Sequence, residues 1–477
     1  MERTMGNWEE KMAYITFITP FGHRLYDREQ NRIIHLQLHE YKALENVKMG
    51  CGTKEDYAIL RKLQNHGFCC ASDLNKIEHP ATKNIETIVR NNINQIVLQI
   101  TQNCNLRCSY CTYSGNYYNR THSKKSMDVK TALAAVDFLM LHSSGVEEVA
   151  ISFYGGEPIL EFELIKSVVH YVKQNYPEKK VRYNLTTNLT MFNDYVIDFL
   201  IKNDVSVMIS IDGPEKVQDK YRVFSNGKGS YSTVVSNAKR ICEKSKEYFA
   251  KCLTNTVISP GSDYRDILDF LDGDELFGPL YSTSTLVNDD DSKIPISYDD
   301  DYYCIYKKEK FKLMLAMLGL IDFESVSSLV KADLTEILKM DRLLLIGGTH
   351  RMKAHHPGGP CIPGQKRVFV DVNGYFYPCE KIAEVDNFKI GDITHGLDYE
   401  KIRQMINVGK CTEDECLKCW AFLYCGTCVA KMVTEGRISR KKRLEQCGNT
   451  KDNLLRHFQD LETLRFYGCD FKQVEEK

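Results

Sequence analysis

The sequence predicts an α/β fold built on a parallel sheet that is either open or closed into a barrel. From Ile93 onward, stretches typical of strands alternate with stretches typical of helices, and successive βα units imply parallel strands. The length of 477 residues and a hydrophobic content of 43% allow roughly two to four domains with sizeable cores. A separate α+β module is expected before this sheet, because strand-like stretches are followed there by helical ones.

The expected strands of the sheet are residues 95–101, 148–153, 181–186, 206–211 and 253–258. The expected helices lie near residues 128–142, 159–174, 194–203 and 231–246, and residues 302–345 are expected to be largely helical. In folds of this kind the active site lies at the carboxyl ends of the strands. The residues that directly follow each strand are therefore the first candidates for function.

Residues 1–75 are expected to form the N-terminal module. Its expected strands are residues 13–19, 23–26 and 32–36, and its expected helices are residues 38–45 and 54–65, with Gly67 as the helix stop. This order is typical of a winged helix-turn-helix, which often binds DNA. The module has ten Lys/Arg and ten Asp/Glu residues, however, whereas a duplex reader needs a basic face. Capture of a peptide by strand addition at the sheet edge fits better, and residues 76–93 are expected to be a polar linker.

The net charge and the first residues of the chain argue against a nucleic-acid-binding, a membrane or a secreted protein. A formal net charge of −1 gives no general attraction to nucleic acid or to an anionic membrane. The first residues are acidic where a signal peptide needs an apolar stretch, and no stretch reaches the ~18 apolar residues of a membrane span. A cytoplasmic location is therefore expected. The basic run at residues 440–443 is expected to be a solvated surface stretch.

The chain has 18 cysteines, and in a reducing compartment these are not expected to form disulfides. Half of them gather near the C-terminus: Cys361, Cys379, Cys411, Cys416, Cys419, Cys425, Cys428, Cys447 and Cys469. Such a density predicts metal ligation.

Three further cysteines directly follow the first expected strand of the sheet, as Cys104-x3-Cys108-x2-Cys111. Full ligation of a [4Fe–4S] cluster takes four cysteines, so three thiolates leave one iron open for chemistry. A zinc knuckle would need a fourth ligand, for which His122 is the nearest candidate. Scattered core cysteines are the other alternative.

This motif resembles the signature of radical S-adenosylmethionine (SAM) enzymes, and segments after the later strands match the same family. Tyr154-Gly155-Gly156-Glu157-Pro158 is similar to its GGEP segment, and Ser210-Ile-Asp212-Gly-Pro is similar to its SLDGP segment. The resemblance implies a partial (β/α)6 barrel. It also implies SAM contacts from Tyr110 near adenine, Gly155, Gly156, Glu157 at the methionine amino group, Asn188, Ser210 near the ribose, Asp212, and Arg222 at the carboxylate.

The resemblance further implies the chemistry. The open iron chelates SAM, an electron from the reduced cluster cleaves the S–C5′ bond, and the resulting 5′-deoxyadenosyl radical removes a hydrogen from the substrate. The protein positions the reactants and excludes water.

The C-terminal cysteines resemble a SPASM domain, which carries auxiliary [4Fe–4S] clusters in enzymes that modify peptides. The resemblance implies one distal cluster held by Cys416, Cys419, Cys425 and Cys447, and one proximal cluster held by Cys361, Cys379 and Cys428. This chain has two residues between Cys425 and Cys428 where the family pattern has three. A zinc ribbon is the alternative.

The proximal set departs from the sulfatase-maturing members of the family. Those relatives have a fourth cysteine shortly before the first of the set, and residues 351–360 contain none. The proximal cluster is therefore expected to have an iron open to a substrate thiolate, unless Cys411 or Cys469 closes it. Those relatives also have an Asp as base after the second cysteine, where this chain has Glu380, a candidate catalytic base.

Together these resemblances predict five parts: residues 1–75 as a winged helix-turn-helix-like element that binds a leader peptide, 76–93 as a linker, 94–290 as the radical SAM barrel, 291–360 as a bridging helical region and 361–477 as the SPASM domain. The expected function is a maturase of the sactipeptide and ranthipeptide group. It would form Cys thioether crosslinks in a ribosomally made precursor peptide with SAM, three [4Fe–4S] clusters and an electron donor such as flavodoxin or ferredoxin. The alternatives are a sulfatase-type maturase that makes formylglycine and a metal-stabilised DNA-binding regulator.

Overall fold

The computed structural model describes residues 12–118, 120–289, 292–358, 360–382, 384–434 and 437–475. Its largest sheet has ten strands, which lie in the spatial order β10 (Tyr281–Leu286), β9 (Leu253–Ile258), β8 (Ser206–Ser210), β7 (Lys180–Thr187), β6 (Glu148–Gly155), β5 (Gln95–Thr101), β12 (Val368–Val370), β13 (Tyr375–Tyr377), β14 (Gly391–Asp392) and β15 (Gly396–Leu397). The strands from β5 to β10 are all parallel. The expected α/β fold is confirmed.

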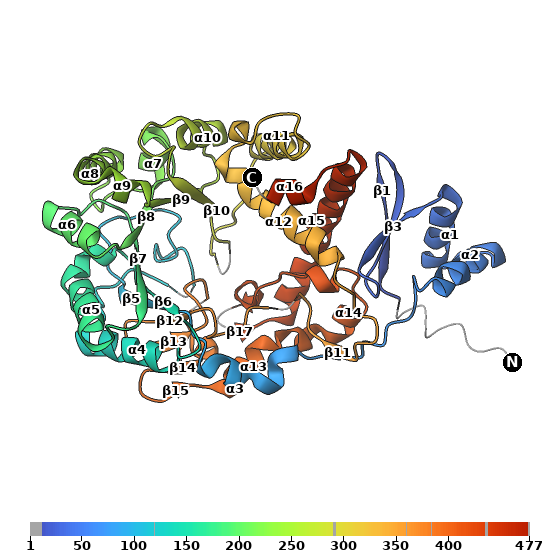
Figure 1. The fold of residues 1–477 in the computed structure, drawn as a ribbon, viewed down its shortest axis with the longest axis horizontal. Coiled ribbons are helices and arrows are strands. Elements are labelled where there is room, and N and C mark those ends of the chain that lie inside the picture. The colour runs from blue at the N-terminus through green and yellow to red at the C-terminus, as the bar shows by residue number, and fades with distance from the viewer. Residues whose placement is uncertain are drawn as a thin grey trace.

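The helices of the barrel lie along the outside of the curved sheet (Figure 1). They are α4 (Val129–Leu141), α5 (Phe162–Asn175), α6 (Asp194–Lys202), α7 (Glu215–Tyr221), α8 (Tyr231–Lys244), α9 (Lys246–Ala250) and α10 (Tyr264–Gly273). Their starts are encoded locally: the Asp128 carboxylate, for example, accepts from the Thr131 backbone N–H at 2.7 Å and caps α4. The alternating apolar residues of β5 and β6 pack against these helices, and Ile96, Leu98 and Ile151 are fully buried.

The Cys-rich end of the chain continues the barrel sheet. Strand β12 pairs in parallel with β5, with Val368 opposite Ile96, and β13 then returns antiparallel with Phe369 opposite Tyr377. The segments around Cys361 and Cys379 flank this hairpin, so the sheet itself brings the C-terminal cysteines toward the strand that precedes Cys104.

The N-terminal module is a three-stranded antiparallel sheet followed by two helices. Its elements are β1 (Tyr14–Thr19), β2 (Gly22–Asp27), β3 (Arg32–Leu36), α1 (Leu38–Lys48) and α2 (Lys54–Asn65). The expected strands and helices are all present, and Gly67 follows α2 with a φ of +85°. The described module therefore fits the strand and helix content of a winged helix-turn-helix, and that assignment stays a prediction. Strand β3 lies at one edge of its sheet.

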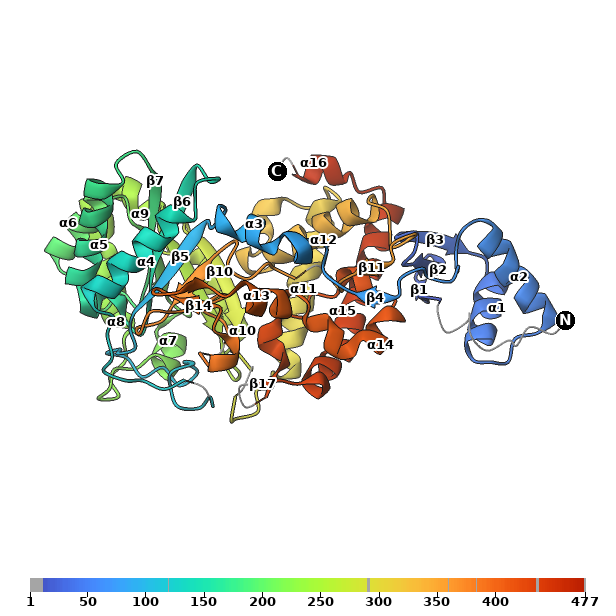
Figure 2. The same ribbon diagram turned by 90° about the horizontal axis from the view of Figure 1, so that it is seen from below.

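The turn between β2 and β3 anchors this module on the C-terminal region. Arg28 is fully buried, and its Nη1 donates to the carbonyls of Leu417 at 2.8 Å and Cys419 at 3.2 Å, although Arg28 and Leu417 are 389 residues apart in the sequence. Glu29 neutralises Arg28 through a 2.7 Å contact and also accepts from the Thr349 hydroxyl at 2.6 Å. The module thus projects from one end of the molecule while its turn is built into the interior (Figure 2).

A helical layer lies between the barrel and the module. It consists of α11 (Asp300–Met317), α12 (Lys331–Leu344), α15 (Arg440–Phe466) and α16 (Phe471–Glu475), in agreement with the helical character expected of residues 302–345. These helices share a core with the module, where the rings of Phe17 and Phe458 lie 6.2 Å apart. Among the described residues, no helix has both the length and the apolar character needed to cross a bilayer.

The shorter elements are β4 (Lys76–Ile77), α3 (Ile85–Arg90), β11 (Ala354–His355), α13 (Tyr399–Ile406), α14 (Glu413–Leu417), β16 (Val433–Thr434) and β17 (Arg437–Ile438). Residues 76–93, expected to be a polar linker, contain β4 and α3, and Ile85 and Val89 of α3 are fully buried. This segment therefore packs on the barrel instead of crossing solvent.

Candidate active site

Cys104, Cys108 and Cys111 lie together on the loop that follows β5. Backbone bonds hold this loop, with the Arg107 N–H donating to the Val223 carbonyl at 2.7 Å. Burial raises the pKa of Cys104 to about 11 and that of Cys108 to about 12, and the thiols are close enough to raise one another's pKa further. Three thiols that are costly to ionise one by one suit a shared cationic iron centre, which is the donor set of a [4Fe–4S] cluster.

Two glycines at the end of β6 contact the backbone at the start of this loop. A Cβ on Gly155 would lie 2.0 Å from the Thr101 carbonyl oxygen, and a Cβ on Gly156 would lie 2.0 Å from the Asn103 carbonyl oxygen. Gly155 also has a φ of +134°, which side-chain-bearing residues rarely adopt. The glycines therefore allow close contact with the cysteine loop itself.

Glu157 continues this segment and is 1% exposed. It accepts from the Asn188 backbone N–H at 2.8 Å and from the Thr187 hydroxyl at 2.7 Å. Burial raises the pKa of Glu157 to about 7 despite these hydrogen bonds. The carboxylate is therefore held in place, and among the described residues it forms no ion pair, which suits it to an amino group.

Asp212, Arg222 and Tyr110 form a buried group beside Cys108. Asp212 is fully buried, and its carboxylate contacts the Arg222 Nε at 3.0 Å and accepts from the Tyr110 hydroxyl. The Arg222 guanidinium lies 5.4 Å from the centroid of the Tyr110 ring. Ser210 ends β8 and is 8% exposed. The sequence-predicted side chains from four separate strand ends are thus brought to the carboxyl edge of the sheet.

Residues 98–272 match the family model of the Radical SAM superfamily. These residues form a radical SAM domain. The structural observations on the cysteine loop, the glycine contact and the convergent polar groups fit this assignment.

Two sequence relatives match the chain over different lengths, and one match is longer than this domain. The chain is 39% identical over 135 residues to an uncharacterised protein of Methanocaldococcus jannaschii, a match that covers 28% of this chain and 44% of that protein, so the chain spans less than half of its length. It is 26% identical over 305 residues to the cysteine-type anaerobic sulfatase-maturating enzyme of Clostridium novyi, which covers 63% of this chain and 76% of that enzyme.

A solved structure, native anSMEcpe with bound AdoMet and Cp18Cys peptide, has a similar fold. Its TM-score is 0.55 at 19% identity, over 77% of this chain and 99% of that chain. This likeness reaches past the radical SAM domain into the C-terminal region.

The proximal cysteines Cys361, Cys379 and Cys428 converge near the radical SAM domain. Burial raises the pKa of Cys379 to about 11, and the charges of Cys428 and Cys361 add to this rise. Cys469 lies elsewhere, because its Sγ contacts the Met317 carbonyl at 3.4 Å.

The distal cysteines converge in a second place. After burial, the charges of Cys416 and Cys425 raise the pKa values of both Cys419 and Cys447. Cys411 belongs to these surroundings, since its pKa responds to Cys416. The described contacts thus place Cys411 beside the distal set and Cys469 against α11.

The described residues contain no group of His, Cys, Asp and Glu side chains that surrounds a single metal ion. A zinc ion would draw its sulfur ligands to ~2.3 Å from one point, whereas a four-iron cluster spreads its thiolates over the corners of a cube. The iron–sulfur and the zinc interpretations of these cysteines therefore both stay predictions. His122, the nearest candidate for a fourth zinc ligand, lies beside Tyr113, and neither of its ring nitrogens makes a hydrogen bond in the described structure.

A polar group inside the barrel lies beside both Cys111 and the proximal cysteines, and most of it was not foreseen from the sequence. The Tyr113 hydroxyl donates to Glu384 at 3.1 Å, the Gln99 amide donates to Glu384 at 2.9 Å, and the Arg120 Nε lies 3.0 Å from the same carboxylate. The Arg120 charge acts on the pKa values of Tyr113 and Cys111. Tyr113, two residues after Cys111, could have been found from the motif, whereas Arg120 and Glu384 carry no local signal.

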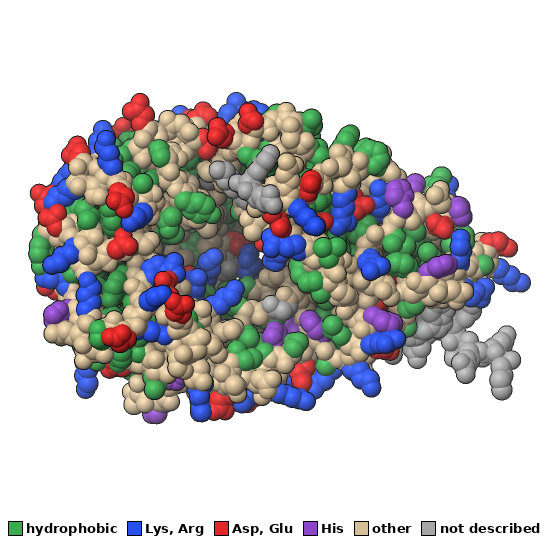
Figure 3. Space-filling view, in the orientation of Figure 1, with side chains coloured by type: hydrophobic (Ala, Val, Ile, Leu, Met, Phe, Trp, Pro, Cys, Tyr) green, Lys and Arg blue, Asp and Glu red, His purple; other side chains and the backbone are tan. Residues whose placement is uncertain are grey.

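Glu380, the predicted base, borders this group. Its Oε1 accepts from the Arg367 Nη1 at 2.7 Å, while its Oε2 is buried and makes no hydrogen bond within the described structure. Buried polar atoms usually have a hydrogen-bond partner, so this oxygen is an unusual feature of the site. In the space-filling view the middle of the molecule is hollowed, and Lys and Arg side chains gather around the hollow (Figure 3).

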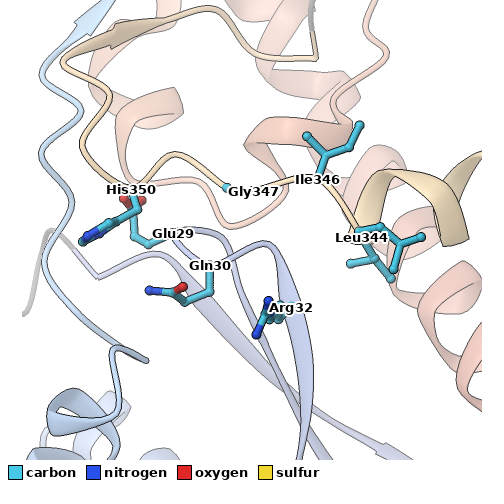
Figure 4. Close-up of a pocket in the computed structure, with 9 residues that line it drawn as sticks. Glu29, Gln30, Arg32, Leu344, Ile346, Gly347 and His350 are labelled. Atoms are coloured by element: carbon cyan, nitrogen blue, oxygen red, sulfur yellow. The ribbon is translucent and has the colours of Figure 1, made fainter.

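A further cavity of about 190 Å³ lies at the base of the N-terminal module (Figure 4). Its lining comes from the β2–β3 turn and from the segment after α12, including Gln30, Arg32, Ile346 and His350.

Proposed function

We propose that this radical SAM enzyme matures a ribosomally made precursor peptide by joining a Cys sulfur to a carbon of an acceptor residue. The proposal is supported by the electrostatic coupling of Cys361, Cys379 and Cys428 to one another. The described contacts of Cys411 and Cys469 are with Cys416 and with the Met317 carbonyl instead. Three protein thiolates leave room for a fourth from the substrate.

The bound cofactors would supply one kind of chemistry, a 5′-deoxyadenosyl radical that removes a hydrogen atom from the acceptor carbon. The cysteine loop would hold the first [4Fe–4S] cluster, and the two C-terminal sets would hold the auxiliary clusters. Glu157, Ser210, Asp212 and Arg222, with Tyr110, Asn188 and the two glycines, would hold SAM.

The chain's own residues would accept the proton of the substrate thiol and exclude water from the radical. Glu380 Oε2, buried without a donor, would accept the proton of the substrate thiol. The bonded group of Tyr113, Gln99 and Glu384 would close the barrel interior and keep water from the radical. Each crosslink removes one hydrogen atom, one proton and one electron, so the peptide loses two hydrogens and the electron passes to a one-electron carrier such as flavodoxin or ferredoxin.

The precursor peptide is the proposed partner. Strand β3 lies at the edge of its sheet and begins at the cavity of Figure 4, so a leader peptide that adds as a strand would run along this edge. The balanced charge of residues 1–75 supports peptide capture over DNA binding.

Formylglycine formation is the second candidate, because 305 residues align with a cysteine-type anaerobic sulfatase-maturating enzyme at 26% identity. The N-terminal module and the missing cysteine in residues 351–360 favour crosslinking over this reaction.

The test is anaerobic co-expression with a short Cys-containing peptide encoded beside the gene, followed by tandem mass spectrometry. We expect a loss of two hydrogens per crosslink, abolished by Cys428→Ala and retained in the matched variant Cys469→Ala. A product with a reactive aldehyde would support the sulfatase-type reaction instead. An unmodified peptide in a reaction that still cleaves SAM would overturn the proposal.

A further inference from the structure

Arg443 is buried where the sequence predicts a solvated charge. It is the last residue of the basic run and lies near the start of α15, yet it is 3% exposed. Arg440, three residues earlier on the same helix, keeps 55% of its side chain exposed and pairs with Glu415 at the surface. The expectation of a solvated stretch is therefore wrong for Arg443, because the helix turns this position toward the distal cysteines.

The hydrogen-bond partners of Arg443 are neutral. Its Nε donates to the Thr412 hydroxyl at 2.7 Å, and its Nη1 lies 3.2 Å from the Met432 sulfur. Within the described ranges, no carboxylate forms an ion pair with it. Arg28, the other fully buried arginine beside this cysteine set, has such a partner in Glu29 at 2.7 Å.

A buried cation without an anion is costly in free energy, so a guanidinium in this position needs a counter-charge. Two thiols of the distal set, those of Cys416 and Cys447, lie beside Arg443 in the described structure. The Cys447 Sγ lies 3.8 Å from the backbone carbonyl of Arg443, one turn along α15. Thr412 connects Arg443 to Cys416, because its hydroxyl lies 2.7 Å from the Arg443 Nε and 3.3 Å from the Cys416 Sγ.

We propose that Arg443 is the counter-charge of the distal auxiliary cluster and raises its midpoint potential. A fixed cation in a dry site favours the reduced cluster, which carries one more negative charge than the oxidised one. The distal cluster is thereby tuned to take the single electron that each crosslink releases. Arg443 acts through the cluster and is a positioning residue. The inference rests on the distal cluster of the proposed function.

The experiment isolates that cluster. In the full-length chain, alanine replaces the five cysteines Cys104, Cys108, Cys111, Cys361 and Cys379, and the protein is reconstituted anaerobically with iron and sulfide. Iron content, the electron paramagnetic resonance spectrum and a potentiometric titration are then measured for this parent and for Arg443→Gln, Arg443→Lys and the surface control Arg440→Gln.

We expect Arg443→Gln to shift the reduction equilibrium at least ten-fold toward the oxidised cluster, which is about 59 mV for one electron. Loss of the cluster iron in this variant, with retention in Arg443→Lys, would equally identify the charge as the requirement. Arg443→Lys is expected to restore most of the potential, and Arg440→Gln to match the parent.

Two results would overturn the inference. One is an Arg443→Gln protein with full iron content whose reduction equilibrium differs less than two-fold from that of the parent, and the other is an Arg443→Lys protein with the same defect as Arg443→Gln. A parent that binds no iron would instead refute the distal cluster. Because none of these readouts involves a peptide, they stand apart from the test of crosslinking.

Discussion

The buried pair of Asp212 and Arg222 offers the sharpest quantitative prediction. Asp212→Asn preserves the shape of the side chain and its acceptor for the Val257 N–H, which it meets at 2.9 Å, but removes the charge. Arg222 is 7% exposed and would lose its ion-pair partner. Breaking a buried pair from one side costs about 3–5 kcal/mol. The free energy of unfolding of a typical domain is about 5–15 kcal/mol, so the barrel would lose a large share of its stability.

The assay is anaerobic urea unfolding of the SAM-free protein, followed by circular dichroism. The matched control is Asp198→Asn, because Asp198 is 64% exposed and pairs with Lys244 at the surface, where a pair contributes about 0.5 kcal/mol. In the cluster-loaded enzyme we expect saturating SAM to recover part of the loss, since in the proposed binding mode its carboxylate would return an anion to Arg222. A loss below about 1 kcal/mol in the SAM-free Asp212→Asn protein would refute the reasoning.

Four further predictions concern Gly155, Glu157 and Arg28. Gly155→Ala should displace the Thr101 carbonyl, because the new Cβ would lie 2.0 Å from its oxygen, and should lower both the iron content of the first cluster and the rate of SAM cleavage at least ten-fold. The control Gly227→Ala, at a positive φ in open space, should leave the iron content and SAM cleavage unchanged. Because the pKa of Glu157 is about 7, SAM affinity should rise about ten-fold from pH 6 to pH 8, and Glu157→Gln should remove this part of the pH dependence in binding titrations. In the SAM-free protein the same proton stabilises the fold fully below about pH 4.5, and this contribution is lost as the pH rises to 7. Arg28→Gln should weaken the attachment of the N-terminal module, so that limited proteolysis cuts residues 76–93 faster than in the wild-type protein. Arg61→Gln, which changes an exposed arginine of the same module, should be cut at the wild-type rate.

The parts of the fold that local pattern determines could be predicted from the sequence. The first five barrel strands and the helices α4, α5, α6 and α8 lie within a few residues of their expected positions, because apolar periodicity and caps such as Asp128 act locally. Strand β10 was not foreseen, since its sequence YSTSTL is mostly polar and partly exposed at the sheet edge. Its place comes from pairing with β9.

The residues of the candidate site also fall into two groups, those that a local motif marks and those that only the fold brings together. The cysteine loop and the GGEP-like segment could be found because each motif is contiguous in the sequence. Arg120 and Glu384 come together only through the fold, and nothing near either residue marks it. The burial of Arg443 also depends on tertiary packing, because a basic run is read as surface unless the buried side of the helix is known.

The pairing of β5 with β12 has a consequence for biosynthesis. Strand β5 carries the cysteine loop at its end, and its partner on one side belongs to the last third of the chain. While the ribosome is still making the segments between them, β5 remains an open edge that invites misassembly with other chains. Chaperoning of this edge, or early loading of iron into the nascent loop, would therefore govern the yield of active enzyme in a heterologous host.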